Sequence, residues 1–401
     1  MPNAPSETPD AAGNSLAEFQ DEAAARALHD RLLTIDTHTD TGPGFATFAL
    51  DPGRITRAQV DLPSMRIGGL DAAFFIVYTP QGVRDEAGYA AARQAAENKY
   101  RGIERMFRAY PGQIGHARTA DDVEAIAASG RLVGLIGMEN AYPLGESVAD
   151  IPMWAARGVR YVSMTHFGHN QFGGSSNPNK ANGDADVDPG LTDLGADLVK
   201  ALNDAGVMVD ISHVGRQTSL DAIAASRAPV IASHSGVAAV FDNPRNLDDE
   251  LLRLVAESGG VAQMVAFRSY IGDVDPKAGA ALTELRSRLG LNSSQGFRNA
   301  SPAVLDEFAL ERARIRAEHP DVTLATFADH VDYAVKTVGI DHVGFSGDFD
   351  GGGGVQGWDG ADESFNVTRE LLKRGYSEAD LAKLWGQNIL RVMRAVEAAA
   401  R

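Results

Sequence analysis

Eight short apolar segments recur along the chain, and most are separated from the next by a stretch with the periodicity of an amphipathic helix. The segments are residues 32–38, 70–78, 131–139, 159–166, 206–213, 229–235, 260–267 and 342–349. Several are apolar on both faces, which is typical of strands in a parallel sheet that helices cover. Eight such strands predict a (β/α)8 TIM barrel, and 401 residues suit that fold with insertions. A doubly wound open sheet is disfavoured, because no glycine-rich dinucleotide fingerprint follows the first strand.

The helical pattern divides the chain into a short lead-in and one large domain. Helices are predicted at residues 86–109, 121–129, 190–205, 216–226, 247–258, 303–317, 326–338 and 377–399. Residues 1–30 are predicted to be a polar N-terminal lead-in with a first helix, and residues 31–401 a single (β/α)8 domain. The stretch 268–325 interrupts the alternation, so we expect an insertion after strand seven near the barrel mouth. The glycine-rich residues 351–363 are expected to form a mobile loop after strand eight.

Charge and composition exclude several partners. The formal net charge is −17, whereas nucleic acids and anionic membranes bind basic surfaces, so neither is expected as a partner. No run approaches the roughly 18 apolar residues of a membrane span, and the N-terminus lacks the features of a signal peptide. We therefore expect a cytoplasmic protein, or a periplasmic or secreted one if a signal peptide has been removed. The chain has no Cys, which excludes disulfides, thiolate metal sites and Cys nucleophiles.

Polar side chains close most of the apolar strands. The first strand runs into Asp36, His38 and Asp40 on alternate positions, which share one face of a strand. Imidazoles and carboxylates at the ends of later strands are Glu139, His166, His213, His234 and Asp348. TIM barrels build their active sites at the C-terminal ends of the strands. The pattern therefore predicts that these side chains share one site.

Imidazoles and carboxylates that meet in this way suit Zn²⁺ or a similar divalent ion. His38 and Asp40 share a face and are predicted to bind one ion, while His213 and His234, from neighbouring strands, are predicted to bind a second. Glu139 has two oxygens and can bridge the two ions. Such a pair, joined by a carboxylate and a hydroxide, is a hydrolytic centre that needs no Ser or Cys nucleophile. Asp36 lies deeper and is expected to support the ligands rather than join them.

Several ordered segments give the chain a family resemblance. The segments are HTD, GLIGMEN, MTHFGHN, VDISH, ASHSG, NPRNLDDE and GIDHVGFSGDFDG, flanked by QVDLPSMRIGG and LWGQNILRVM. Together they resemble the membrane dipeptidase (renal dipeptidase) family of zinc peptidases over residues 32–393. The resemblance implies an amidohydrolase-type barrel with two zinc ions, held by the same five ligands that the strand ends predict.

The resemblance also implies roles that spacing does not settle. His166 would polarise the scissile carbonyl and stabilise the oxyanion, with His169 as a rival for that role. Arg245 would bind the terminal carboxylate of the substrate, and Asp348 would transfer a proton to the leaving amine. His342 and Asp350 are expected to orient loops. The remaining histidines, for which no functional role is expected, are His29, His116, His319 and His330.

The predicted function is a binuclear zinc dipeptidase that hydrolyses short dipeptides, with a D-residue at the C-terminal position as one option. The absence of Cys and of a lipid-anchor signal is typical of a bacterial relative rather than of the mammalian enzymes, and a homodimer is possible by resemblance. Two alternatives stay open at this point. The same site would also serve N-acyl amino acids, cyclic amides or lactones, or the chain would be a metal-binding accessory protein without peptidase activity.

Overall fold

The computed structural model describes residues 21–42, 44–292, 294–319 and 322–401. Of the lead-in and first helix predicted at residues 1–30, residues 1–20 lie outside the described residues, and residues 21–29 are helical. Within the described residues the strands form one parallel sheet, in the order β1-β2-β4-β5-β6-β7-β8-β9, with β3 paired to β4. The strands are β1 (Ile35–Thr39), β2 (Ala72–Tyr78), β3 (Ile114–His116), β4 (Leu132–Glu139), β5 (Val159–Ser163), β6 (Met208–Asp210), β7 (Val230–Ser235), β8 (Val261–Val265) and β9 (Val343–Ser346).

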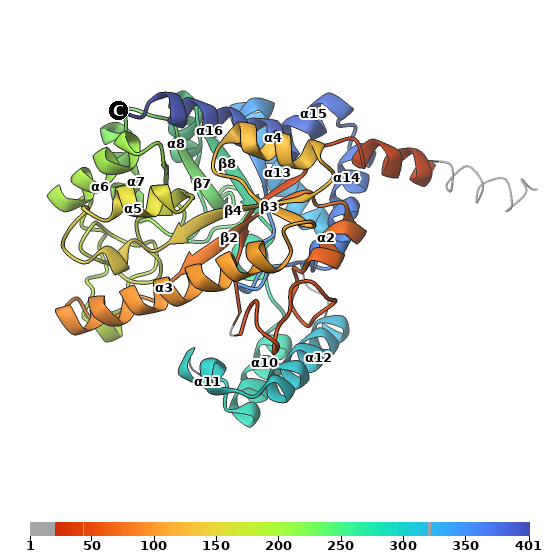
Figure 1. Ribbon diagram of the computed structural model, residues 1–401, viewed down its shortest axis with the longest axis horizontal. Helices are drawn as coiled ribbons and strands as arrows, with labels where there is room; N and C mark the ends of the chain where they lie inside the picture. Colours follow the sequence, from red (N-terminus) through yellow and green to blue (C-terminus); the bar gives the residue numbers. More distant parts are fainter. Residues whose placement is uncertain (1–20, 43, 293, 320–321) are drawn as a thin grey trace, which may run out of the picture.

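The sheet closes into a barrel between its first and last strands. Thr39 at the end of β1 pairs with Phe349 beyond β9, and the Asp40 N–H donates to the Phe349 carbonyl at 2.8 Å. Helices surround the strands (Figure 1). The architecture is therefore the predicted α/β TIM barrel, with eight strands around the ring and a short extra strand, β3, that the sequence periodicity missed because it is only three residues long.

The helices include all eight that the sequence predicted. They are α2 (Leu62–Gly68), α3 (Glu86–Ala109), α4 (Ala120–Ala128), α5 (Ile151–Ala156), α6 (Asp193–Asp204), α7 (Arg216–Ala225), α8 (Asp249–Glu257), α9 (Arg268–Ile271), α10 (Pro276–Leu289), α11 (Ser294–Asn299), α12 (Pro302–Glu318), α13 (Leu324–Val338), α14 (Ser364–Lys373), α15 (Glu378–Ala382) and α16 (Asn388–Ala398). Those eight are α3, α4, α6, α7, α8, α12, α13 and α15–α16, and α2, α5, α9, α10, α11 and α14 were not predicted. A π-helical turn, Lys383–Gln387, joins α15 to α16 within the predicted 377–399 helix. None of the helices in the described ranges is long and apolar enough to cross a membrane.

Four predicted strands end two or three residues earlier than expected, namely β5 at Ser163, β6 at Asp210, β8 at Val265 and β9 at Ser346. His166, His213 and Asp348 therefore lie in the loops that follow and not in the strands themselves. The backbone explains the early end of β6, because His213 has a φ of 66°, which is left-handed and incompatible with a strand. The backbone of these loops, and not strand geometry, therefore sets the directions of the His166 and His213 imidazoles.

The stretch after β8 contains α9 to α12, of which only α12 is close to a predicted helix. α10, α11 and α12 lie together at the lower edge of the view, away from most of the barrel helices (Figure 1). α10 and α12 share a small apolar cluster that includes Leu285 and Phe308. The insertion touches two loops at the C-terminal side of the barrel through ion pairs of Arg57 with Asp306 (2.8 Å) and of Arg316 with Asp359 (2.6 Å).

The glycine-rich stretch 351–363, expected to be a mobile loop, is anchored in the structure. Val355 and Trp358 are completely buried in the main core. The Gly354 N–H donates to the Ala266 carbonyl at 2.6 Å, which ties the loop to the end of β8. This loop is therefore a fixed wall of the barrel mouth.

Candidate metal centre

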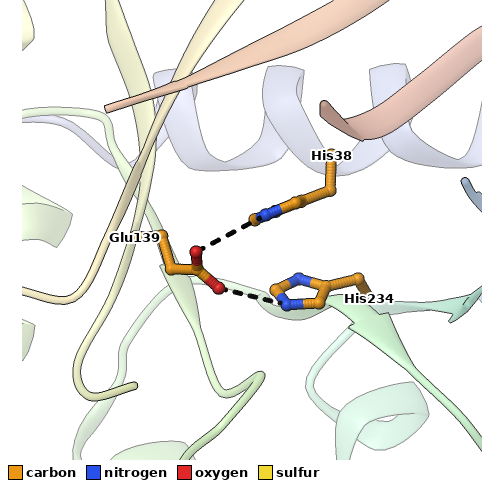
Figure 2. Close-up of side chains that lie close together, drawn as sticks. All are labelled: His38, Glu139 and His234. Atoms are coloured by element: carbon orange, nitrogen blue, oxygen red, sulfur yellow. Dashed lines mark ion pairs between the residues drawn. The ribbon is translucent and has the colours of Figure 1, made fainter. Parts of the chain in front are cut away.

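The candidate metal ligands converge at the C-terminal ends of the barrel strands. His38 lies on β1, Glu139 ends β4 and His234 lies on β7. Figure 2 shows the Glu139 carboxylate facing the imidazoles of His38 and His234, with one oxygen directed at each. The two imidazole rings lie 3.8 Å apart, centroid to centroid. Strands that are about 100 residues apart in sequence therefore deliver these side chains to one point.

The two carboxylate oxygens of Glu139 face different histidines. Oε1 lies 3.0 Å from Nε2 of His213 and 3.3 Å from Nε2 of His234. Oε2 lies 3.7 Å from Nε2 of His38, and that same Nε2 lies 3.9 Å from Oδ2 of Asp40. His213 and His234 thus face one oxygen of Glu139 and His38 faces the other, although the rings of His38 and His234 are neighbours.

The His38 imidazole is oriented by a tyrosine. The Tyr161 hydroxyl donates to the Thr37 carbonyl at 2.9 Å, so it accepts from Nδ1–H of His38, also at 2.9 Å. A hydroxyl has only one proton to donate. Nδ1 of His38 therefore carries a proton that it donates to Tyr161, and Nε2 is the nitrogen directed at Glu139.

A serine orients His234 in the same way. The Ser233 hydroxyl donates to Oδ2 of the buried Asp210 at 2.6 Å and accepts from Nδ1–H of His234 at 2.8 Å. Metal-binding histidines usually donate one ring N–H to an outer partner, which fixes the tautomer and leaves the other nitrogen to the ion. His38 and His234 both have this arrangement.

Buried polar atoms without partners indicate that the cluster fits a cation. Among the described residues no hydrogen-bond partner is found for Nε2 of His38, Oδ1 of Asp40, Nδ1 of His213 or Nε2 of His234. Buried polar groups are normally hydrogen-bonded, because leaving one unpaired costs about 1–3 kcal/mol. Imidazole nitrogens and carboxylate oxygens are also the donors that Zn²⁺ binds. Three of these atoms, on His38, Asp40 and His234, therefore suit a metal site, whereas the nitrogen of His213 that faces Glu139 is Nε2 and not the unpartnered Nδ1.

The electrostatics of the cluster agree with this chemistry. Burial lowers the pKa of His213 and of His234 well below the ordinary value, so both are neutral donors. Burial opposes ionisation of Glu139, but the nearby His38 and His166 overcome it and lower its pKa well below the usual range. Burial also opposes protonation of His38, yet Glu139 and the other carboxylates raise its pKa to about 9. A cation bound at His38 must therefore displace a proton.

Unusual backbone conformations gather around the cluster. Asn140, His213, Asp348 and Asp350 have positive φ values of 74°, 66°, 48° and 61°. Such conformations of non-glycine residues cost of order 1–3 kcal/mol each and concentrate at functional sites. Of the positive-φ non-glycine residues in the described ranges, only Ala46 lies away from the predicted site residues.

Asp36 supports the site from below. Its carboxylate accepts from the His38 N–H at 3.0 Å and from the Gly347 N–H at 3.1 Å. Burial raises the pKa of Asp36 to about 6. Asp36 thus connects β1 to the loop that carries Asp348.

Asp348 approaches His38 and Asp40. Its carboxylate lies within 4.8 Å of ligand atoms of both His38 and Asp40. A Cβ at Gly351 would lie 2.3 Å from Oδ1 of Asp348 and 2.6 Å from Oδ2 of Asp40, so this close approach requires a glycine. Burial raises the pKa of Asp348 well above its usual value.

The two histidines that follow β5 differ in surroundings. His166 is half-buried, and its ring lies 4.2 Å from that of His213 and 4.9 Å from that of Tyr78. Burial lowers the pKa of His166 to about 4. His169 uses both ring nitrogens within its own loop: Nδ1 accepts from the Ser175 N–H at 2.9 Å and Nε2 lies 3.1 Å from a backbone carbonyl. His166 is therefore the imidazole available to a substrate.

Arg245 is buried beside the cluster. Nη2 donates to the His234 carbonyl at 2.8 Å and Nη1 to Oγ of Ser235 at 3.2 Å, and the guanidinium lies 5.2 Å from the centre of the Tyr270 ring. Its Nε has no partner within the described part of the chain. Arg245 is thus held in place by two of its five N–H donors, and its Nε–H is one that stays unused.

Three side chains around the site were not singled out from the sequence. Tyr161 orients His38, Tyr270 covers Arg245, and Lys99 on α3 donates to the Thr41 carbonyl next to Asp40. The aromatic residues gave no signal, because buried tyrosines are ordinary core residues. Lys99 gave one, since it interrupts the apolar stripe of its helix.

A parallel (β/α)8 barrel with imidazoles and carboxylates clustered at its C-terminal rim defines a metal-dependent hydrolase. Comparison with known proteins is consistent with this class. Residues 22–401 match the family described as membrane dipeptidase, peptidase family M19, and the chain belongs to that family. It is therefore a metal-dependent peptide hydrolase, as the sequence motifs predicted.

Relatives support the same placement. A dipeptidase of Aspergillus terreus, ataJ, is 30% identical over 401 residues, which cover 93% of this chain and 87% of the relative. The structure of the probable dipeptidase PvdM from Pseudomonas aeruginosa is 35% identical with a TM-score of 0.83, covering 95% of this chain and all of that one. A metallopeptidase of Rhodobacter sphaeroides, 23% identical with a TM-score of 0.68, shares the fold and covers 91% of this chain and 99% of its own.

Proposed function

We propose that the protein is a binuclear zinc dipeptidase. His38 and Asp40 would hold one ion, His213 and His234 the other, and Glu139 would lie between them. The observation that carries this proposal is the position of the Glu139 carboxylate: one oxygen faces His38, and the other faces His213 and His234. When bound, a zinc pair would supply a nucleophilic water near neutral pH and polarise the scissile carbonyl.

Arg245 would bind the terminal carboxylate of the dipeptide. Arg245 as a whole is 3% exposed, so its charge attracts a carboxylate with little screening by solvent. The bonds to the His234 carbonyl and to Ser235 hold its plane fixed, and the free Nε provides a hydrogen-bond donor. The substrate is thereby oriented before the amide reaches the metal ligands.

His166 and Asp348 would handle the charge and the proton of the reaction. A pKa of about 4 keeps His166 neutral at pH 7, so its N–H can donate to the carbonyl oxygen as negative charge develops there. Burial raises the pKa of Asp348, which suits a carboxylate that takes a proton from water and gives it to the leaving amine.

The substrate would be a short dipeptide, and a D-residue at its C-terminal position is part of the proposal. The Rhodobacter sphaeroides metallopeptidase is described as liganded with a phosphinate mimic of the dipeptide L-Ala-D-Ala. The shared fold makes L–D dipeptides the first substrates to test. Arg245 requires only a free carboxylate, so N-acyl amino acids belong in the same panel.

The deciding experiment combines metal analysis with a substrate panel. We expect two zinc ions per chain, and kcat/KM values that are higher for L–L or L–D dipeptides than for N-acyl amino acids, cyclic amides or lactones. A preference for N-acyl amino acids, cyclic amides or lactones would change the proposed substrate class but leave the proposed metal centre intact. Two metal ions with no turnover of any amide would instead indicate an accessory protein. Light scattering on the same sample tests the homodimer that the family resemblance suggests.

A further inference from the structure

Lys99 occupies an inward position of α3 that the helix otherwise fills with apolar residues. Ala92, Ala96, Ile103 and Met106 are buried on this face. Lys99 continues their spacing of three and four residues, which places it on the same stripe. An ammonium at such a position costs free energy unless it is paired and hydrogen-bonded.

The Lys99 ammonium is directed at the segment that carries Asp40. Nζ donates to the carbonyl oxygen of Thr41, the residue after Asp40. Its charge also interacts favourably with Asp40, Glu139 and Asp350. The same helix contacts the segment again farther along, where Arg105 donates to the carbonyls of residues 45 and 46, each at 3.2 Å. α3 therefore fastens the segment after β1 at two places, one of them beside a metal ligand.

We propose that Lys99 is a positioning residue for Asp40. Its hydrogen bond fixes the turn after β1, so that the Asp40 carboxylate stays directed at His38 and at the cation that these two side chains would share. The inference rests on the proposed metal centre. It also has a definite sign: if Lys99 acted only as a nearby positive charge, its removal would strengthen cation binding, whereas the loss of positioning weakens it.

The test is a Co²⁺ titration of the metal-free protein, followed by visible absorption, which reports the ligand geometry of each ion. For Lys99→Met we expect one of two Co²⁺ equivalents to bind about 10- to 100-fold more weakly, the size of effect typical of an outer partner of a metal ligand. The absorption of that ion should change while the other equivalent is unaffected. Lys99→Arg should restore binding, and Arg105→Met, which releases the same segment farther from Asp40, should leave both equivalents unchanged.

The absence of Cys from the chain allows a chemical rescue. Lys99→Cys places one thiol in the protein, and alkylation with 2-bromoethylamine rebuilds an ammonium side chain at this position. We expect weak binding of one equivalent before alkylation and recovery after it, which also separates positioning from a folding defect of the Met variant. Unchanged or tighter Co²⁺ binding by Lys99→Met, or no recovery on alkylation, would overturn the inference. A wild-type protein that binds no Co²⁺ would instead overturn the metal centre itself.

Discussion

Two regions of this protein bury histidines, and they do so in opposite ways. In the layer around the barrel, Nδ1 of His29 lies 2.7 Å from the Thr368 hydroxyl oxygen, and Nε2 lies 2.9 Å from the Gly68 carbonyl oxygen. His330 on α13 likewise accepts from the Val237 N–H at 3.0 Å and contacts the Ile271 carbonyl at 3.1 Å. Both imidazoles use both nitrogens.

At the rim of the barrel, His38 and His234 are equally buried but use only one nitrogen. Nδ1 of each is held by a hydroxyl, and Nε2 of each faces Glu139 without a hydrogen-bond partner in the described ranges. Residue type and burial are therefore the same in the two regions. What distinguishes the proposed metal ligands His38 and His234 from His29 and His330 is the second nitrogen.

The largest effect on the proposed metal site is expected from removal of the Glu139 carboxylate. Glu139→Gln should abolish turnover and weaken metal binding by at least about 100-fold, because Glu139 contacts the ligands on both sides and even outer partners cost 10- to 100-fold. Metal analysis and kcat/KM measure both effects. Glu97→Gln is the matched control, because Glu97 is not part of the cluster and forms an ion pair with Arg157, with 2.7 Å between the charged atoms. A Glu139→Gln protein that retained its metal would remove the basis of the comparison.

Asp348→Asn separates proton transfer from metal binding. We expect kcat to fall by about 10²- to 10⁴-fold, the range for loss of a general acid or base, with the metal content unchanged. Asp350→Asn is the control on the same loop, because its carboxylate accepts from the backbone N–H groups of residues 59 and 60 instead. Undiminished hydrolysis by the Asp348→Asn protein would exclude the proton-transfer role.

Tyr161→Phe tests whether the Tyr161 hydroxyl orients His38 so that Nε2 faces the proposed metal site. The substitution keeps the ring and removes the hydroxyl that holds Nδ1, so metal affinity should fall about 10- to 100-fold. Tyr142→Phe is a suitable control, since this buried hydroxyl donates to the Val83 carbonyl, which is not part of the cluster. Competition with a chelator measures both affinities. Equal affinities in the two variants would show that the hydroxyl does not prepare the ligand.

The sequence predicted the parts of the site that belong to strands. The period of two places His38 and Asp36 on one face, and Glu139 and His234 end or lie within predicted strands. The same periodicity extended four strands two or three residues too far, because it carries no information about left-handed residues such as His213 and Asp348. The barrel count and α3 were predicted well, since long amphipathic helices give strong signals.

Long-range partners could not be predicted from periodicity. Tyr161 meets His38 across 123 positions, and Lys99 meets Thr41 across 58. The helices α10 and α11 were also missed, because glycine and polar residues weaken the pattern over residues 276–299. Such features depend on packing between segments, which a single sequence does not display.

The smallest expected effect concerns His330, in the layer of helices around the barrel, and changes only the pH dependence of stability. Burial lowers the pKa of His330 from 6.5 to about 4. Between these values the unfolded chain binds a proton that the folded chain does not, so the free energy of unfolding decreases as the pH falls from 6.5 to 4, by about 3 kcal/mol at most for this group. Above pH 6.5 the group contributes no pH dependence. His330→Gln should flatten this part of the profile in urea unfolding while metal content and kcat/KM stay unchanged. If the variant kept the full slope, or lost metal, the division between the two kinds of buried histidine would be wrong.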